Sequence, residues 1–554
     1  MDRNTLLAFF LIAIILIFTP KFMEMVAPVS PPPTELNEDI VETEPPQPGV
    51  NTAALNDSPQ KIPKLEALSL PLVKEQLITL ENNLYEAVVS SRGGGSFVSF
   101  SFKNYFDHDS QRVNLINGLN KENLAIRLKN LDGENVNLSD NWSYGGLNFI
   151  FIDRDETLVF STEISPGKTI TKTLTFHPDS YIIDVVVNTE EASNQIFSGA
   201  YTLGWYGGLP TTEKNTKDDL VYFKSYVFQG GELEDIKIKK GDTESITFNG
   251  ATDWVAIRTK YFIASLIPEN SNQVASASIG GSYNDREIYD MVLSFPAAST
   301  SYSSLYLGPL EYDRIKNVGR DLDRVMNFGI WPVIHISKIV LWTLKKLHEV
   351  IPNYGYILIV FAFVVKLLVY PLTKKSYQST AAMQRLQPEI VALKEKYKNN
   401  AKKLNEATMK LYKEKGVNPL GGCLPILLQM PLLFALFIVF RTTIELRAEP
   451  FIFWIKDLSA PDAVFTLPFS IPIYGAHVAI LPILMVVSMF IQQRMMGGGA
   501  AQQPQQKTMQ YFMTGFFFLM FNTFPSGLNL YYTLFNVLTI AQQKLIPPAE
   551  TITT

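Results

Sequence analysis

Five apolar runs follow one another in the second half of the chain, and they restrict the fold more than any other feature. They cover residues 356–372, 420–440, 473–491, 511–524 and 528–545. A helix needs about 20 mostly apolar residues to cross the hydrocarbon core of a bilayer. Two of the runs are short or polar at their ends, and a Pro-Ser-Gly break at residues 525–527 separates the last two. This break predicts a helical hairpin that turns at the far side of a membrane.

A further apolar segment lies near the N-terminus, at residues 6–18. It could be a signal peptide that is removed, but no A-x-A cleavage site follows promptly, and Pro28 comes directly after Ala27. We therefore expect an uncleaved signal-anchor helix over residues 1–26, which brings the predicted number of spans to six. Charged residues make up only 18% of the chain, against about 25% in typical soluble proteins, which agrees with a polytopic α-helical membrane protein.

Two segments of different composition separate the anchor from the apolar runs. Residues 27–64 are rich in proline and acidic residues and should form an extended, disordered linker. Residues 65–320 are predicted to form an all-β domain, because residues 168–176 alternate between polar and apolar side chains in the manner of a half-buried strand. Further predicted strands cover residues 126–129, 181–187, 245–248 and 303–307. Many short strands with Gly, Asn and Pro turns predict a large β-sandwich.

Residues 321–352 combine apolar side chains with lysines and two tryptophans, Trp331 and Trp342. Such a pattern is typical of an amphipathic helix that lies in the membrane interface, where tryptophan is enriched. The alternative is a core helix of the preceding soluble domain.

The charge of the loops predicts the orientation of the chain, because positive loops stay in the cytoplasm. The loop at residues 373–419 carries eleven basic residues against four acidic ones. The basic residues are Lys374, Lys375, Arg385, Lys394, Lys396, Lys398, Lys402, Lys403, Lys410, Lys413 and Lys415. Both termini should then be cytoplasmic, including the short tail at residues 547–554, and the β domain should lie outside, in the periplasm of a bacterium with an outer membrane.

The same loop contains two predicted helices, at residues 377–397 and 402–415. Pro388 should kink or restart the first helix, and Gly416 should end the second. One apolar face of the first helix is formed by Leu386, Ile390, Leu393 and Tyr397. The pattern predicts a basic helical hairpin, and the alternative is a solvated loop that only orients the chain.

The sequence contains no recognisable catalytic constellation. None of its histidines (His108, His177, His335, His348 and His477) lies in a metalloprotease, redox or nucleophile-elbow motif. The only cysteine, Cys423, lies in an apolar run, so that no intramolecular disulfide can form, and we interpret it as a small apolar side chain. We therefore predict no enzymatic activity, no cofactor and no metal site.

Polar residues inside the apolar runs are the better functional candidates. Lys366 interrupts the run at residues 357–370. A charge inside a span is costly and indicates a function, but this lysine could also extend toward the cytoplasmic surface, and the spacing does not decide between the two. Further polar residues are Gln429, Ser488, Gln492, Asn522, Asn529, Tyr531, Tyr532 and Asn536. Each alone fits an interhelical hydrogen bond, and together they would allow a wet interior shared by several helices.

Three motifs closely resemble the YidC proteins of the Oxa-type insertase superfamily. Residues 370–374 read YPLTK, residues 418–431 read NPLGGCLPILLQMP, and residues 524–532 read FPSGLNLYY. The resemblance covers about residues 325–546, and the β domain resembles the family more loosely, mainly at residues 252–262. A β domain behind an N-terminal anchor looks like the Gram-negative form of the family.

The resemblance implies an insertase core at residues 353–546, in which five helices enclose a hydrophilic groove open to the cytoplasm and to lipid. A basic residue in the groove attracts the polar or acidic flank of an incoming chain. That residue is usually arginine; here it is Lys366, which keeps the charge but loses the planar fork. The family also tends to have a hydroxyl one turn earlier, where this chain has Ala362. The expected groove residues are Lys366, Gln429, Asn529, Tyr531, Tyr532 and Asn536.

The resemblance further implies a protein of the bacterial inner membrane that inserts hydrophobic client segments, alone or with the Sec translocon. The implied partners are nascent membrane proteins, the Sec translocon, membrane lipids and the ribosome, which the basic loop would contact; recognition of a specific nucleic acid sequence is not implied. In the family the β domain is a supersandwich similar to sugar-mutarotase folds.

Two other functions remain as alternatives. A transporter or channel would also place polar residues in its spans, but it would need an internal repeat, which we do not find. A sugar-binding or sugar-modifying β domain on a membrane anchor is the second, although a fold alone does not establish a function.

Overall fold

A computed structural model describes residues 74–496 and 504–545, apart from residues 117, 119, 121, 140–141, 399 and 418–423. All of them belong to one compact unit, Val73–Thr554. The predicted signal anchor, the whole of the proline-rich linker, Cys423 and the C-terminal tail lie outside the described residues.

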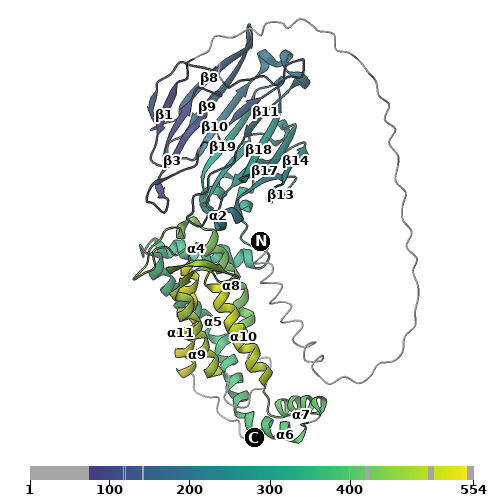
Figure 1. The fold of residues 1–554 in the computed structure, drawn as a ribbon, viewed down its shortest axis with the longest axis vertical. Helices are drawn as coiled ribbons and strands as arrows, with labels where there is room; N and C mark the ends of the chain where they lie inside the picture. Colours follow the sequence, from purple (N-terminus) through teal and green to yellow (C-terminus); the bar gives the residue numbers. More distant parts are fainter. Residues whose placement is uncertain are drawn as a thin grey trace, which may run out of the picture. The chain divides into compact units, whose positions relative to one another are not determined.

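Three sheets form the β domain within the described residues (Figure 1). The largest has the order β13 (Glu232–Ile236), β12 (Lys224–Gln229), β15 (Trp254–Arg258), β16 (Phe262–Pro268), β19 (Ser301–Pro309), β10 (Ile182–Asn188), β9 (Lys168–Phe176), β8 (Glu156–Ser165) and β6 (Ser143–Tyr144). The second has the order β4 (Arg112–Asn114), β3 (Ser96–Phe106), β2 (Tyr85–Ser90), β1 (Leu77–Glu81) and β7 (Phe149–Phe151). The third has the order β14 (Thr243–Asn249), β17 (Ser276–Asn284), β18 (Arg286–Pro296), β11 (Ala200–Trp205) and β5 (Ala125–Arg127).

The alternating sequence of β9 explains its place in the largest sheet. Ile170, Leu174 and Phe176 are buried, whereas the threonines between them are half-buried on the other face. The strand predicted at residues 168–176 is confirmed, and those predicted at 245–248 and 303–307 lie inside longer strands. The strand predicted at 181–187 begins and ends one residue later. The prediction for residues 126–129 was wrong at its end, because β5 ends at Arg127.

Short helices lie within the β domain, between that domain and α4, and after α8. They are α2 (Thr216–Tyr222), α3 (Tyr312–Val318) and the 3-10 helices η1 (Glu190–Gln195), η2 (Phe197–Gly199), η3 (Ser271–Gln273), η4 (Leu322–Met326) and η6 (Ile444–Leu446). The helix expected at residues 321–352 is shorter than predicted, because α4 covers only Val333–His348. Asn327 has a left-handed backbone and Pro332 precedes the helix, so that the helix cannot begin earlier. On α4, Val340 and Leu344 are buried, whereas Ile339 and Trp342 are exposed.

Five longer helices carry the apolar runs (Figure 1): α5 (Tyr354–Arg385), α8 (Leu424–Thr442), α9 (Ile480–Met496), α10 (Pro504–Phe521) and α11 (Ser526–Leu545). Among the described residues, α5 is the one helix that is long and apolar enough, by length and composition, to cross a membrane. The apolar helical stretches at Gln429–Thr442, Ile480–Met495 and Tyr511–Phe521 are shorter. The α11 helix packs against α9 and α5, and α4 packs against α8.

The third apolar run is not a continuous helix, contrary to our expectation. Its first residues belong to a β-hairpin formed by β20 (Ala463–Ile471) and β21 (Gly475–Ala479), and α9 begins only at Ile480. Pro472 disfavours a helical conformation for the residue before it, and Gly475 has a φ of +92°, which a helix does not allow.

The basic loop forms a pair of helices, α6 (Gln387–Lys396) and α7 (Ala401–Glu414), and α7 agrees with the helix predicted at residues 402–415. The helix predicted at residues 377–397 was wrong at its start, because residues 377–385 continue α5 without a break and α6 begins only at Gln387. Pro388 lies in the first turn of α6, where its missing N–H is tolerated, so the predicted restart is confirmed. Asn400 caps α7 by accepting a hydrogen bond from the backbone N–H of Lys403. Leu386, Ile390 and Leu411 are buried together between the two helices.

Candidate functional site

Lys366 lies on α5, and its ammonium group points toward α11. The Nζ atom donates a hydrogen bond of 2.7 Å to Oγ1 of Thr539. It also lies 4.5 Å from the ring centre of Phe535 and 5.9 Å from that of Tyr377. The side chain is buried, and it forms no ion pair with any acidic residue that the structure describes. This environment holds a cation between two helices with a hydroxyl and aromatic faces as its neighbours.

Thr539 is oriented to receive this hydrogen bond. Its hydroxyl donates to the backbone carbonyl of Phe535 at 2.7 Å, so that an oxygen lone pair faces Lys366. A second contact joins the same two helices further along, where Nε2 of Gln542 donates to Oγ1 of Thr373 at 3.1 Å. Sequence reasoning missed both Thr539 and Gln542. The available signal was the spacing of three residues from Asn536 to Thr539 and again from Thr539 to Gln542, which makes each successive pair neighbours on a helix surface.

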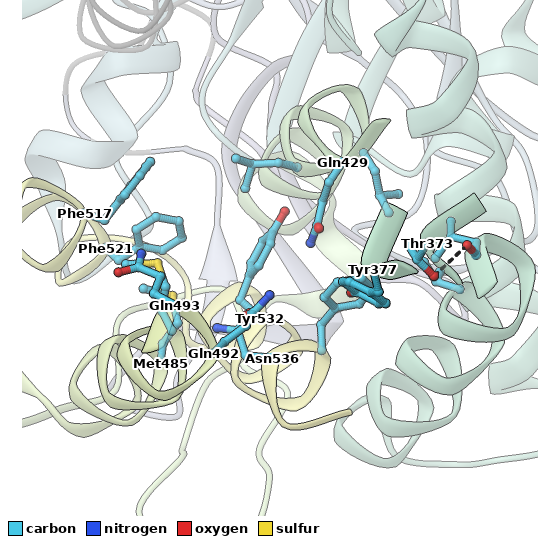
Figure 2. A pocket seen from close by; sticks show the side chains of 16 residues that line it. Thr373, Tyr377, Gln429, Met485, Gln492, Gln493, Phe517, Phe521, Tyr532 and Asn536 are labelled. Atoms are coloured by element: carbon cyan, nitrogen blue, oxygen red, sulfur yellow. Dashed lines mark hydrogen bonds between the residues drawn. The ribbon is translucent and has the colours of Figure 1, made fainter. Parts of the chain in front are cut away.

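A cavity of about 310 Å³ lies between α5, α8, α9, α10 and α11 (Figure 2). Its walls are mixed. The cavity is lined by apolar side chains, such as Leu432, Met485 and Phe517, and by polar side chains. The polar side chains include Gln429, Gln492, Gln493, Tyr532 and Asn536. Lys366 lies beside the cavity, because its neighbours Val365, Val369 and Phe535 form part of the wall.

Three of the expected groove residues, Gln429, Tyr532 and Asn536, therefore line one cavity (Figure 2). Asn529 and Tyr531 do not line it. Asn529 donates to the backbone carbonyl of Phe521 at 3.1 Å and so fastens the turn between α10 and α11.

Hydrogen bonds also connect the helices around the cavity. Nδ2 of Asn536 donates to Oγ of Ser488 at 3.2 Å, which links α11 to α9. Oγ1 of Thr514 donates to Oε1 of Gln493 at 3.2 Å, which links α10 to α9. The polar residues thus serve partly as interhelical contacts, as expected for each residue alone.

Some buried polar atoms have no hydrogen-bond partner among the described residues. The hydroxyls of Tyr531 and Tyr532 and Oε1 of Gln542 belong to this group. Leaving such an atom unpaired costs roughly 1–3 kcal/mol. A polar group of a bound chain, or water, would satisfy the Tyr532 hydroxyl at the cavity wall.

The basic loop presents its lysines to solvent. Lys374, Lys375, Lys396, Lys402 and Lys403 are exposed, and they form no ion pair with another described residue. Lys394 is half-buried and Arg385 is exposed. Elsewhere in the loop, Lys398 pairs with Glu395, Lys410 with Glu414 and Lys415 with Glu389. The loop therefore keeps an excess of positive charge at its surface.

The segment at residues 252–262, which resembled the family only loosely, forms β15 and the turn into β16, and it contacts the apolar helices through charge. Nζ of Lys260 lies 2.7 Å from Oδ2 of Asp218 on α2, and Nε of Arg441 at the end of α8 donates to Oδ1 of the same aspartate at 3.1 Å. Burial disfavours the charged carboxylate, but the cations of Lys260 and Arg441 outweigh it and lower the pKa of Asp218 to about 2. Nε of Arg447 adds a second ion pair with Glu213 at 2.7 Å. We refer to Asp218, Lys260 and Arg441 as the junction triad.

The described residues contain no group of three or more His, Cys, Asp or Glu side chains that could hold a metal ion. The polar side chains at the cavity can form hydrogen bonds and attract charged groups.

Family models and named relatives both match this chain. A family model described as "60Kd inner membrane protein" matches residues 346–551, and a model described as "YidC periplasmic domain" matches residues 77–343. The chain is 35% identical to a protein of Chlorobaculum parvum named membrane protein insertase YidC, over 99% of this chain and 94% of that protein. It is 36% identical to a protein of the same name from Prosthecochloris aestuarii, over 98% and 94%. A solved structure described as an active YidC insertase with the first transmembrane domain resolved is 19% identical, over 86% of this chain and 93% of that chain, with a TM-score of 0.37.

Proposed function

Because the chain belongs to the YidC family of membrane protein insertases, we propose that its cavity receives the polar flank of a client segment before that segment enters lipid. The protein is an integral membrane protein with a mostly β-sheet periplasmic domain, and it acts on membrane protein clients as an insertase and not as an enzyme. Membership of this family does not favour a transporter or channel.

The observation that carries the proposal is the setting of Lys366 beside a cavity with mixed walls. A buried cation is costly unless a negative or polar group compensates it. Among the described residues, its one side-chain hydrogen bond is to the hydroxyl of Thr539. An acidic or polar flank of a client would complete this compensation, and the apolar wall would guide the hydrophobic segment toward the bilayer.

The finer architecture is part of the same proposal. We propose six spans, namely a signal anchor at residues 1–26 followed by α5, α8, α9, α10 and α11, with both termini in the cytoplasm. The 17 residues of α9 extend over roughly 25 Å, a little less than the hydrocarbon core of about 30 Å. Thinning of the bilayer or flanking interfacial residues would accommodate this difference at modest cost.

The proposed domain boundaries follow from this architecture. They are residues 27–64 for the linker, 65–320 for the β domain, 321–352 for the interfacial segment, 353–546 for the insertase core including the basic hairpin at 373–419, and 547–554 for the tail. The exposed Ile339 and Trp342 support an interfacial position of α4.

The basic hairpin is the proposed reception site for arriving chains. Its support is the set of exposed lysines that form no ion pair with another described residue, among them Lys396, Lys402 and Lys403. Ribosomal RNA and acidic nascent segments are polyanions that such a surface attracts. We propose the ribosome, the Sec translocon and membrane lipids as further partners, and we propose that insertion proceeds alone or with the translocon.

The first experiment exchanges the charge at position 366. Two clients that differ only in an acidic or neutral flank are inserted into vesicles that contain the full-length protein. Lys366→Arg should keep insertion within about 2-fold, whereas Lys366→Glu should slow the acidic client at least about 10-fold and the neutral client less, since like charges in a low-dielectric site repel by more than about 1.4 kcal/mol. Lys129→Glu, the same charge reversal at an exposed position of the β domain, is the control. Equal rates for both clients in all variants would contradict the electrostatic role.

The second experiment asks whether water reaches position 366. In a Cys423→Ser background, Lys366→Cys should react with a soluble maleimide added from the cytoplasmic side. Leu368→Cys, whose side chain is 71% exposed on the helix surface, should face lipid and stay unlabelled. Protection of position 366 together with labelling of position 368 would contradict the proposed groove.

The third experiment neutralises Lys394, Lys396, Lys402 and Lys403 together by substitution with glutamine. Expression and topology should persist, because Lys374, Lys375 and Arg385 still keep the loop positive. Client insertion should fall several-fold. The difference in insertion rate between the variant and the unaltered protein should become smaller as salt is added, because salt screens the lysines that the unaltered protein still has. Normal insertion at physiological salt would mean that the loop only orients the chain.

A further inference from the structure

The β20–β21 hairpin lies in the segment that connects α8 to α9, and its second strand falls within the third apolar run, where a helix was expected. Asn522, which directly follows α10, fastens it. Nδ2 of Asn522 donates to the backbone carbonyls of Tyr474 and His477 at 2.8 and 2.7 Å, and Oδ1 accepts from the backbone N–H of Ala479 at 3.1 Å. One side chain therefore satisfies three backbone groups of the hairpin.

The base of the hairpin is fixed to the start of α9. Oδ2 of Asp462 accepts hydrogen bonds from the backbone N–H groups of Ile480 and Leu481, at 3.0 and 2.8 Å, and from Nε1 of Trp454 at 2.9 Å. The hairpin thus sits at the beginning of α9 and the end of α10. The basic loop joins α5 to α8, and the hairpin follows the other end of α8, so the proposed topology puts the hairpin on the periplasmic side.

The surface of the hairpin is apolar and uncharged. Residues 463–479 contain no Asp, Glu, Lys or Arg. The side chains of Phe465, Phe469 and Ile473 are each 61% exposed, and Val464 is 48% exposed. Exposed apolar patches of this kind mark binding surfaces on proteins.

The backbone of the hairpin restricts what can cover this surface. A two-stranded ribbon has unpaired N–H and C=O groups along both edges, which excludes it from the hydrocarbon core of a bilayer. Pro468 removes one donor from such an edge. The headgroup region supplies water and polar groups for the edges, and the acyl boundary takes up aromatic side chains.

We propose that the β20–β21 hairpin is a lipid anchor in the periplasmic leaflet, with Phe465, Phe469 and Ile473 immersed at the boundary between headgroups and acyl chains. Lipid is the occupant because the hairpin is continuous in the chain with helices of an integral membrane protein and carries no charge for a protein partner to match. The anchor sets the depth of α9, which contributes Met485 and Gln492 to the cavity wall. This goes beyond the insertase function, since it assigns a lipid site outside the cavity.

The test uses the full chain with Cys423→Ser, reconstituted in vesicles of phosphatidylethanolamine and phosphatidylglycerol. A nitroxide is attached to a cysteine at position 465, 469 or 473, and its collisions with oxygen and with a water-soluble nickel chelate are measured by power saturation. We expect collisions with oxygen to exceed collisions with the nickel chelate several-fold at all three positions. A label at Val159, an exposed strand position of the β domain, should collide more with the nickel chelate, and a label at Leu368 should collide more with oxygen.

Two outcomes would overturn the proposal. Dominance of nickel at the hairpin positions would place the hairpin in water, and low collision rates with both reagents would mean that a protein surface covers it. A second measurement distinguishes a change in the depth of the hairpin from misfolding. The label stays at position 473, and Phe465→Ser and Phe469→Ser are introduced together. Nickel access at 473 should then rise several-fold, whereas Thr466→Ser should leave it unchanged, and no rise in the double variant would also overturn the anchor.

Discussion

Replacing Asp218 by asparagine should loosen the junction triad. The carboxylate accepts from both Lys260 and Arg441, whose side chains are 5% and 18% exposed. Asparagine keeps the size of the side chain and one carbonyl oxygen, but it removes the negative charge. Two largely buried cations would then face each other without compensation.

The size of the effect follows from the pKa of Asp218, which falls from 3.8 to about 2 in the folded protein. A shift of one unit corresponds to about 1.4 kcal/mol, so that the charge contributes about 2 kcal/mol. Leaving buried cations unpaired raises the cost toward roughly 3–5 kcal/mol. Because the folded pKa is lowered, this contribution is present above the unfolded pKa of about 4 and is lost as the pH falls toward about 2.

The assay is hydrogen exchange of the full chain in lipid nanodiscs, since a protein of this size does not unfold in a single two-state step. Amides of α2 and of the turn between β15 and β16 should exchange at least about 30-fold faster in Asp218→Asn, the factor that about 2 kcal/mol implies. Asp235→Asn is the matched control, because Asp235 pairs with Lys224 at 2.5 Å but is 37% exposed. That exposed pair should contribute less than about 1 kcal/mol.

Adding Arg441→Gln to Asp218→Asn should cost less than the sum of the single changes, since one stranded cation is removed. Equal exchange rates in Asp218→Asn and Asp235→Asn would refute the reasoning. Additive effects of Asp218→Asn and Arg441→Gln would refute the coupling within the junction triad.

Three further substitutions test the packing of the helices. Gly527→Val should reduce the yield of folded protein in a gel-filtration assay, because a Cβ there would lie 2.6 Å from the ring of Phe440, whereas Gly515→Ala, with no atom within 4 Å of its Cβ, should not. Thr539→Val should slow insertion of clients with an acidic flank several-fold and Thr539→Ser should not, since only valine removes the acceptor of Lys366; equal rates would contradict this role. Asn522→Ala should speed hydrogen exchange in the β20–β21 hairpin about 10-fold or more, and unchanged exchange would mean that Asn522 does not fasten it.

Local patterns in the sequence were sufficient for much of the fold. The alternation in residues 168–176 predicted β9, and Pro388 predicted the start of α6, because each depends on neighbours within a few residues. Lys366 was recognised as a candidate from the sequence alone, since a charge within an apolar run is costly in any arrangement of helices.

Hydropathy could not separate a helix from a strand in the third apolar run. Residues 473–479 carry no charge and continue directly into the apolar helix that follows, and period and composition are ambiguous over such a short stretch. The hydrogen bonds of Asn522, more than 40 residues away, satisfy the backbone of the hairpin and so stabilise it as a strand pair.

The sequence by itself determined that the chain is apolar in five long runs, positive in one loop and alternating in its β domain, because these are properties of adjacent residues. Only the tertiary structure decided which polar groups meet. Thr539 reaches Lys366 across 173 residues, and Arg441 reaches Asp218 across 223. Threonine, glutamine and arginine are ordinary residues at helix surfaces and ends. Their partners are set by the packing of helices and sheets against one another, which the spacing of residues along the chain does not contain.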